Sequence, residues 1–175
     1  GAVGDGVSND RNAIQSAINS LQESGLAGTI TFPRGRYLTT GYLHITGSFI
    51  TLQGANGSYI TTPTSGDFRK INISGASGIS IYNLNIDAGR VTSGRSPVYT
   101  GTVNIYSSNY ISIKNCNLAH SEGLLVHIRG ATNKVWLENN TFEDFHIGVF
   151  GDSNDISGAA FNNVSITNNV FRESW

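Results

Sequence analysis

The amino-acid sequence predicts an all-β protein wound as a parallel β-helix, because a short phrase returns along the chain and its polar and apolar residues alternate. The phrase begins at Ile79, Ile111, Val135 and Val164, so successive copies start 32, 24 and 29 residues apart. A degenerate copy begins at Ile50. Repeats of roughly 20 to 50 residues indicate a solenoid, in which each repeat forms one turn and stacks on the next.

Within each copy, apolar side chains occupy alternate positions, as Ile79 and Ile81 do. This two-residue period is typical of a strand with one buried face, and β-branched residues favour a strand over a helix. Asparagine adopts turn conformations readily, and stacked amides bond to one another in assemblies of strands. We therefore expect a column of stacked turns, with amide side chains bonded along it, at Asn83, Asn115, Asn139 and Asn168.

A second run of alternating apolar residues precedes the copies of the phrase and leads into them through a short corner. Each coil therefore holds at least two strands joined by tight corners. The predicted buried pairs of this second strand are Leu43/Ile45, Ile71/Ile73, Val103/Ile105, Val126/Ile128 and Ile147/Val149.

The chain divides into residues 1–28, which form an opening glycine-rich turn and a helix, and residues 29–175, which form the coils. The chain begins at a glycine, contains no methionine and stops within the repeat. From this we expect the N-terminal part of a longer β-helix.

The helix is predicted over about residues 9–24, where apolar residues recur at helical spacing. Ser8 or Asn9 suits its N-cap, and Gly25 suits its end. An open end of a β-helix exposes unpaired backbone groups and apolar side chains. We therefore expect this helix to cover that end.

Composition limits the range of functions. The net charge is −1 and only 13% of residues are charged, which gives no electrostatic basis for binding nucleic acid or an anionic membrane. No apolar run reaches the length of about 18 residues that a membrane span requires. Cys116 is the one cysteine, so no disulfide forms within the chain, and we expect a reduced core or turn residue.

The first 37 residues resemble a known family. Gly4-Asp5-Gly6 with Asn9-Asp10, followed by Gly28-Thr-Ile-Thr-Phe-Pro-Arg-Gly-Arg-Tyr37, is similar to the opening of pectate lyase superfamily proteins. These include phage tailspike depolymerases, polysaccharide lyases and mannuronan epimerases. The resemblance implies a right-handed β-helix, carbohydrate chemistry on a face of stacked strands, and a location outside the cell or on a virion surface.

The outward positions of the second strand should line up when its buried pairs are aligned, with neighbouring rungs about 4.8 Å apart. Amides, imidazoles and guanidinium groups bond sugar hydroxyls, and aromatic rings stack on sugar C–H faces. We therefore predict a polysaccharide-binding face, although an ordinary polar surface has the same composition. One row holds His44, Asn72, Asn104 and His127, and the next holds Thr46, Ser74, Tyr106, Arg129 and Phe150. Asn104, Tyr106 and Phe150 are assigned to substrate binding.

Residues 119–129 form the richest polar patch. His127 and Arg129 should project from one strand, with His120 and Glu122 at the turn before it. One coil later, we expect Asp144 beside His120, and His146 near the row of His127.

Each side chain of this patch suits a role in catalysis or binding. His127 is a candidate base, and Arg129 suits the carboxylate of a uronate sugar. Glu122 and Asp144 are candidates for the carboxylate pair of a glycosidase. His120 and His146 are assigned to substrate binding. The alternative is that all of these are structural polar groups.

Three stretches, residues 61–68, 87–100 and 151–162, break the rhythm of the coils. Loops on a rigid scaffold often bind ligands, and on this ground Arg90 and Arg95 are assigned to substrate binding. Tolerated surface insertions are the alternative. No cofactor is predicted, and Asp152 with Asp155 gives only weak grounds for a calcium ion.

The patch departs from the catalytic signatures of the superfamily. It lacks the Asp-Pro-His-Glu segment of the epimerases, the repeated aspartates of calcium-dependent pectate lyases, and the paired aspartates and Gly-His-Gly of polygalacturonases. Three hypotheses stay open. The first is a β-helix that degrades a surface or matrix polysaccharide by hydrolysis or elimination. The second is a polysaccharide-binding module without catalysis, and the third is a structural spacer in a homotrimeric spike.

Overall fold

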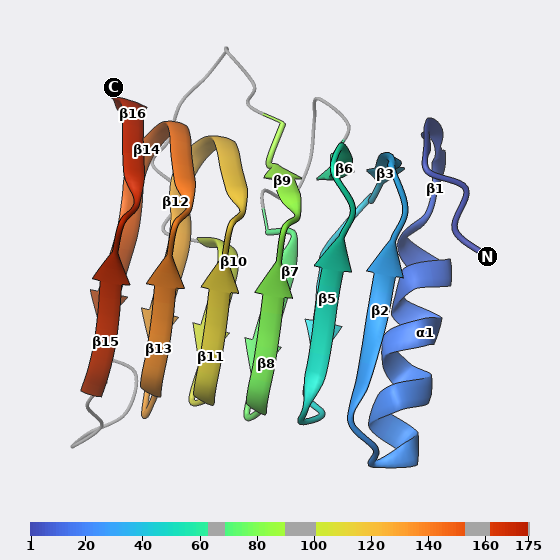
Figure 1. Cartoon of the computed structure of the whole chain (residues 1–175), viewed down its shortest axis with the longest axis horizontal. Helices are drawn as coiled ribbons and strands as arrows, with labels where there is room; N and C mark the ends of the chain where they lie inside the picture. Colours follow the sequence, from blue (N-terminus) through green and yellow to red (C-terminus); the bar gives the residue numbers. More distant parts are fainter. Residues whose placement is uncertain (63–68, 90–100, 153–161, 175) are drawn as a thin grey trace.

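The computed structural model describes residues 1–62, 69–89, 101–152 and 162–174. The chain winds as a right-handed parallel β-helix, with α1 (Arg11–Ser24) at its N-terminal end (Figure 1). Neighbouring strands pair in parallel throughout the two sheets. The predicted fold class is therefore confirmed.

Each coil contributes to three faces, which we number in chain order. Face 1 holds the repeated phrase, on β2 (Gly28–Phe32), β5 (Ile50–Gly54), β8 (Ser77–Tyr82), β11 (Asn109–Lys114), β13 (Asn133–Glu138) and β15 (Asn162–Thr167). Face 2 holds β1 (Asp5–Asn9), β3 (Gly35–Leu38), β6 (Ser58–Thr61), β9 (Asn85–Asp87), β16 (Val170–Ser174) and the first parts of β12 (Asn117–Arg129) and β14 (Thr141–Asp152). Face 3 holds β4 (Leu43–Ile45), β7 (Ile71–Ser74), β10 (Gly101–Tyr106) and the later parts of β12 and β14.

The core follows the two predicted ladders of apolar residues. Ile79, Ile111 and Val135 stack in register on face 1, and Leu43, Ile71 and Val103 stack on face 3. All six side chains are buried. Because every coil adds inward side chains directly over the previous coil, the apolar surface that one coil leaves open is covered by the next.

The predicted column of asparagines is present, and Asn83 Nδ2 donates to Gly54 O of the previous coil (3.0 Å), but in the later coils the amide ladder lies one residue further on. Asn83, Asn115, Asn139 and Asn168 all have φ near +55°, the left-handed conformation of a tight corner. Asn115 and Asn139 are exposed, whereas Asn140 is buried, accepts a bond from Cys116 N (2.9 Å) and donates to Ile113 O (2.9 Å). Asn169 repeats this pattern, accepting from Asn140 N and donating to Leu137 O.

Helix α1 (Arg11–Ser24) covers the N-terminal end of the coil, as predicted, and begins two residues later than expected. Ile14 and Ile18 are buried against the first coil. Gln15 and Gln22 bond the backbone of the edge strand β4 and the residues after it, at His44 N, His44 O and Thr46 N. The helix therefore buries apolar side chains and also pairs backbone groups that an edge strand would leave exposed.

Neither Ser8 nor Asp10 caps the helix with its side chain. The Asp10 carboxylate, at the N-cap, accepts bonds from Val3 N (2.6 Å) and Gly4 N (3.0 Å) and so fixes the opening turn instead. The side chain of Asn9 accepts a bond from Arg11 N at 3.2 Å. The end of the helix agrees with the prediction, since Gly25 adopts a left-handed φ of 64°.

The predicted register of the last coil on face 3 is wrong. Val149 pairs with Val126, Phe150 with His127, and Asp152 with Arg129. The cause is a register shift between Ser121 and Leu124, where β12 holds one more residue than β14. Phe150 therefore leaves its predicted row and joins that of His127, while Asp152 takes the place beside Arg129.

Cys116 is a buried core residue, as expected. Burial raises the pKa of its thiol to about 12. Within the described part of the chain, no helix has the length and apolarity needed to cross a membrane.

Candidate functional site

Face 3 presents two outward rows of polar and aromatic side chains. The alternation of each strand directs Leu43, Ile71 and Val103 inward and the residues between them outward. In the observed register, one row holds His44, Asn72, Asn104, His127 and Phe150, and the other holds Ser74, Tyr106, Arg129 and Asp152. The first row agrees with the prediction for its first four members.

The two rows meet in a cluster centred on Asp152. His127 Nε2 lies 2.7 Å from Asp152 Oδ2, and Arg129 Nε lies 4.0 Å from the same oxygen. The His127 side chain is only 3% exposed, the Asp152 side chain 18% and the Arg129 side chain 31%. With Nε2–H donating to Asp152, the neutral imidazole carries its lone pair on Nδ1.

Aromatic rings flank this cluster. The ring centroid of Phe150 lies 5.5 Å from that of His127, and the Arg129 guanidinium carbon lies 5.9 Å from the centroid of the Tyr106 ring. Asn104 Nδ2 donates to Asn72 Oδ1 at 2.7 Å, which links two coils along the row. The cluster thus combines an acid, an imidazole, a guanidinium group and two rings on adjacent rungs.

Gly101 gives the cluster the space it needs. A Cβ atom built on Gly101 would lie 2.6 Å from the Cβ of His127. Contacts that short do not occur between real side chains, so a larger residue would displace the imidazole.

The remaining residues of the predicted patch lie apart from this cluster. Glu122 is buried in the irregular segment of β12 that leads from face 2 to face 3, and its Oε1 has no hydrogen-bond partner among the described residues. As predicted, Asp144 lies beside His120, at the equivalent position on the adjacent coil. Both residues have a left-handed φ. His146 is exposed and lies outside the row of His127, because Phe150 takes that position.

Three predicted residues fall outside the described part of the chain: Arg90, Arg95 and Asp155. Of the suggested calcium ligands only Asp152 is described, and it is bonded to His127. Among the described residues, no three His, Cys, Asp or Glu side chains are grouped so that they could hold a metal ion.

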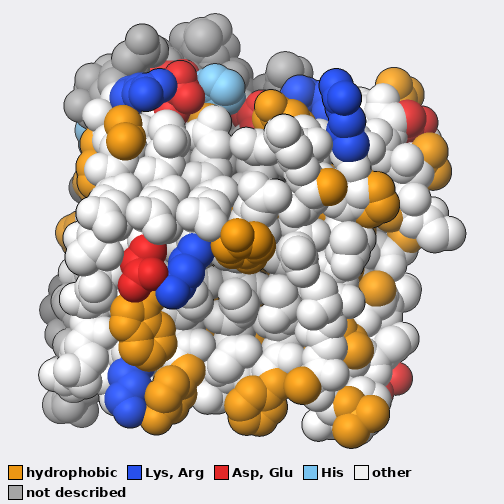
Figure 2. All heavy atoms as spheres, in the orientation of Figure 1, with side chains coloured by type: hydrophobic (Ala, Val, Ile, Leu, Met, Phe, Trp, Pro, Cys, Tyr) orange, Lys and Arg blue, Asp and Glu red, His pale blue; other side chains and the backbone are white. Residues whose placement is uncertain are grey.

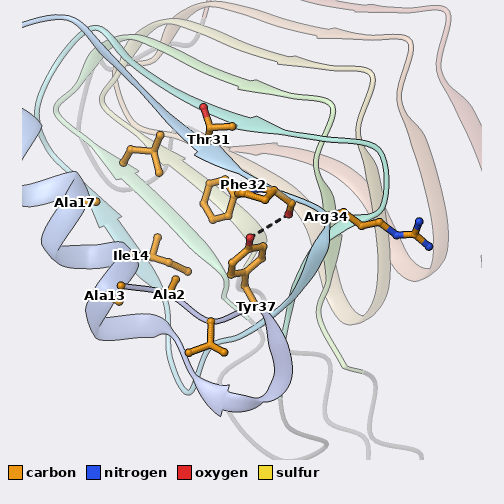
Figure 3. A pocket seen from close by; sticks show the side chains of 12 residues that line it. Ala2, Ala13, Ile14, Ala17, Thr31, Phe32, Arg34 and Tyr37 are labelled. Carbon is orange, nitrogen blue, oxygen red and sulfur yellow. Dashed lines mark hydrogen bonds between the residues drawn. The ribbon is translucent and has the colours of Figure 1, made fainter.

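A hollow of about 380 Å³ lies between α1 and the first coil (Figure 3). Its lining side chains differ in chemistry from the outward rows of face 3. Ile14, Ala17 and Phe32 supply an apolar lining. The Tyr37 hydroxyl donates to Pro33 O at 3.0 Å, and burial raises the pKa of that hydroxyl. Arg34 points away from the hollow (Figure 3). The lining holds no carboxylate or imidazole, so we assign this hollow to the packing of the helix.

A protein-family comparison matches residues 1–173 to the family described as rhamnogalacturonase A/epimerase, pectate lyase-like. The chain belongs to this pectate lyase-like family. The match covers nearly the whole chain and so extends the resemblance of the first 37 residues to all the coils. No curated protein matches the chain.

Solved structures show the same fold as this pectate lyase-like chain. A Parabacteroides merdae protein, provisionally assigned as a glycosyl hydrolase, has a TM-score of 0.59 at 16% identity, covering 97% of this chain and 94% of its own. The surface adhesin PfbA of Streptococcus pneumoniae gives 0.64 at 16%, with 97% and 55% covered. The A-module of the Azotobacter vinelandii mannuronan C-5 epimerase AlgE4 gives 0.52 at 18%, with 97% and 56% covered. This chain thus spans about half the length of the last two proteins.

Sequence reasoning found His127 and Arg129 but missed Asp152 as their partner. A signal was available in the spacing from the repeated phrase. Leu118 and Val126 are eight residues apart, and Phe142 and Val149 are seven apart, so a one-residue difference aligns Val149 with Val126. The assumed pairing of Ile147 with Val126 required a three-residue difference instead.

Proposed function

We propose that this pectate lyase-like chain binds an acidic polysaccharide across face 3 and cleaves it there. The observation that carries the proposal is the cluster in which Asp152 is shared by His127 and Arg129. Family membership supports carbohydrate chemistry on this fold, while the reaction has to be argued from the residues of the site. As part of the proposal, the protein acts outside the cell or on a virion surface, where it meets such polymers.

Arg129 is the proposed ligand for a uronate carboxylate. A guanidinium group forms two parallel hydrogen bonds to a carboxylate, and a ring below it fixes its plane. Arg129 has this support from Tyr106 and is partly exposed. Tyr106 and Phe150 present rings on which the C–H face of a sugar stacks. A polymer running along the β-helix axis would meet these groups on successive rungs.

The Asp152–His127 pair is the proposed source of the base. Because His127 is almost fully buried, the more exposed Asp152 is the member of the pair that a substrate meets first. In elimination, the base takes the proton from the carbon next to the uronate carboxylate, whose charge Arg129 balances. The bond to the leaving oxygen then breaks, a carbon–carbon double bond forms, and the leaving oxygen takes up a proton. His127 orients the carboxylate and stabilises it through the 2.7 Å bond.

Hydrolysis requires a different set of groups, namely two carboxyl groups placed on either side of the scissile bond. Glu122 and Asp144, the predicted pair, differ in setting, since Glu122 is buried between faces 2 and 3. Elimination is therefore the reaction that the face 3 cluster supports best.

A second candidate function, binding without cleavage, is favoured by the burial of His127. An imidazole that is 3% exposed holds Asp152 and Arg129 in place as well in a binding site as in a catalytic one. In that case the aromatic and charged rows retain the polymer intact.

The test uses the full chain with polygalacturonate and with alginate, and measures both the ultraviolet absorbance of unsaturated uronate ends and the formation of reducing ends. Elimination raises both signals, hydrolysis raises only the second, and binding alone leaves both flat while the polymer is retained in a pull-down. Arg129→Ala should abolish whichever of cleavage and polymer retention the wild type shows. Lys114→Ala, a matched loss of positive charge on face 1, should preserve it. Wild-type protein that neither cleaves nor retains either polymer contradicts the proposal.

A further inference from the structure

A second hollow lies on face 2, away from the His127 cluster. Its volume is about 120 Å³, and it lies over β6, β9, β12 and β14. In Figure 2, acidic, basic and histidine side chains gather along the upper edge, where these strands lie in Figure 1. Its lining includes Tyr59, Asp87, Asn117, Ala119, His120 and Glu143.

The hollow exists because a small residue separates two carboxylates. Asp87, Ala119 and Glu143 occupy the same outward position on three successive rungs. Adjacent rungs are about 4.8 Å apart, which places the two acidic residues about 10 Å apart with a methyl group between them. A larger side chain at Ala119 would fill that gap.

One wall of the hollow is held in place by contacts at its side. Asp87 Oδ1 lies 2.9 Å from His120 Nδ1, and Asp87 Oδ2 lies 3.8 Å from a terminal nitrogen of Arg36. The guanidinium carbon of Arg36 lies 5.0 Å from the centroid of the Tyr59 ring. Asp87 and Tyr59 are thus positioned before any ligand arrives, which lowers the entropy lost on binding.

The carboxylates of Asp87 and Glu143 give the hollow two groups that accept hydrogen bonds. Carboxylates accept hydrogen bonds only, so a ligand that donates hydroxyl hydrogens suits them. Asn117 also lines the hollow, but its Oδ1 atom is buried, so a ligand in the hollow does not reach that atom.

We propose that the face 2 hollow is a binding site for a neutral sugar unit, which donates hydroxyl hydrogens to Glu143 and Asp87 beside the Tyr59 ring. A uronate is disfavoured here, because its carboxylate would face Glu143 and would have no hydrogen to donate. The two faces therefore differ in chemistry: face 3 offers a guanidinium group to an acidic sugar, and face 2 offers acceptors to a neutral one. This proposal does not depend on cleavage at face 3.

The test measures binding of neutral hexasaccharides of glucose, xylose, mannose and galactose, with hexagalacturonate as the acidic probe, by isothermal titration calorimetry on the full chain. At least one neutral probe should bind, and Ala119→Leu should weaken it at least tenfold by filling the hollow. Ser112→Leu adds a side chain of the same size on face 1 and should leave the affinity within about twofold of wild type.

Glu143→Gln separates a binding role from a structural one. Glutamine keeps the size of the side chain and replaces one acceptor oxygen by a donating amide, so the variant should melt close to wild type while losing at least tenfold in affinity. Because Glu143 is only partly buried, this variant is not expected to unfold, and it keeps the test informative if Ala119→Leu folds poorly.

His127→Ala distinguishes this proposal from the one for face 3. It should leave the affinity for the neutral probe unchanged, and Ala119→Leu should leave the response to polygalacturonate unchanged. The absence of binding by every neutral probe overturns the face 2 proposal. So does binding that both Ala119→Leu and Glu143→Gln leave intact.

Discussion

Faces 1 and 3 share one apolar core and differ in what surrounds their outward charges. On face 1, Lys114 Nζ lies 2.8 Å from Glu138 Oε2, with 40% and 28% of the two side chains exposed. Figure 2 shows this face, on which uncharged side chains predominate. On face 3, His127 and Asp152 lie 2.7 Å apart in a far less exposed setting. Water and salt screen the first pair much more than the second.

This difference shows why a short distance between charges does not by itself mark a site. An exposed pair such as Lys114–Glu138 contributes about 0–1 kcal/mol. Removing one partner of a buried pair leaves the other without water or a counter-charge, which costs more. The outward groups on face 3 are thus held in one arrangement, as a binding site requires.

The largest effect is expected from Asp152→Asn. The asparagine keeps the shape but removes the negative charge that His127 and Arg129 share, so cleavage should fall by about 100-fold or more. The fold should lose about 1–3 kcal/mol, measured by urea denaturation. Glu138→Gln makes the same change on face 1 and should change each quantity little. Equal effects from the two substitutions would remove the contrast between the faces.

A smaller effect is expected from Gly101→Ala, which acts on the same cluster through packing. The added methyl group would lie 2.6 Å from the Cβ of His127 and should cost about 1–3 kcal/mol. Displacing His127 should also weaken binding of polygalacturonate, measured by calorimetry. Ser80→Ala on face 1 serves as the control and should leave both stability and binding close to wild type. A Gly101→Ala protein with wild-type affinity would show that the imidazole does not position the site.

The smallest effect at neutral pH is expected from Cys116, which lies beneath the corner between faces 1 and 2. Its pKa rises from 9.0 to about 12 on folding, so the unfolded chain ionises first. The stability due to the protonated thiol is complete below pH 9 and is lost as the pH rises toward 12, by about 1.4 kcal/mol per pH unit. Denaturation of wild type and Cys116→Ala from pH 8 to 11 should show this slope only in wild type. Parallel curves would contradict the assignment.

The architecture was predictable because its determinants repeat. Alternating apolar residues and the asparagines at one offset identify the strands and one column of corners. A second left-handed column, at the start of the face 1 strands, escaped prediction because its residues share no chemistry. Its members are Phe49, Gly78, Tyr110, Lys134 and Asn163.

The site was predictable only in part, because sites depend on register and on deviations from the repeat. His127 and Arg129 follow from the alternation of β12 and were placed correctly on face 3. Asp152 was missed because the extra residue in the 121–124 segment shifts β14 relative to the assumed pairing. Asp87 and Ala119 were missed because the strands of face 2, which follow the repeated phrase, were not recognised as a separate face.

The central claim is that an acidic polysaccharide binds face 3. The most direct measurement is a backbone-amide chemical-shift titration of the isotope-labelled chain with hexagalacturonate. Binding at face 3 predicts the largest shifts at Tyr106, Arg129 and Asp152, and their loss in Arg129→Ala. Shifts that gather instead on face 1, around Tyr110 and Trp136, and that persist in Arg129→Ala would contradict it.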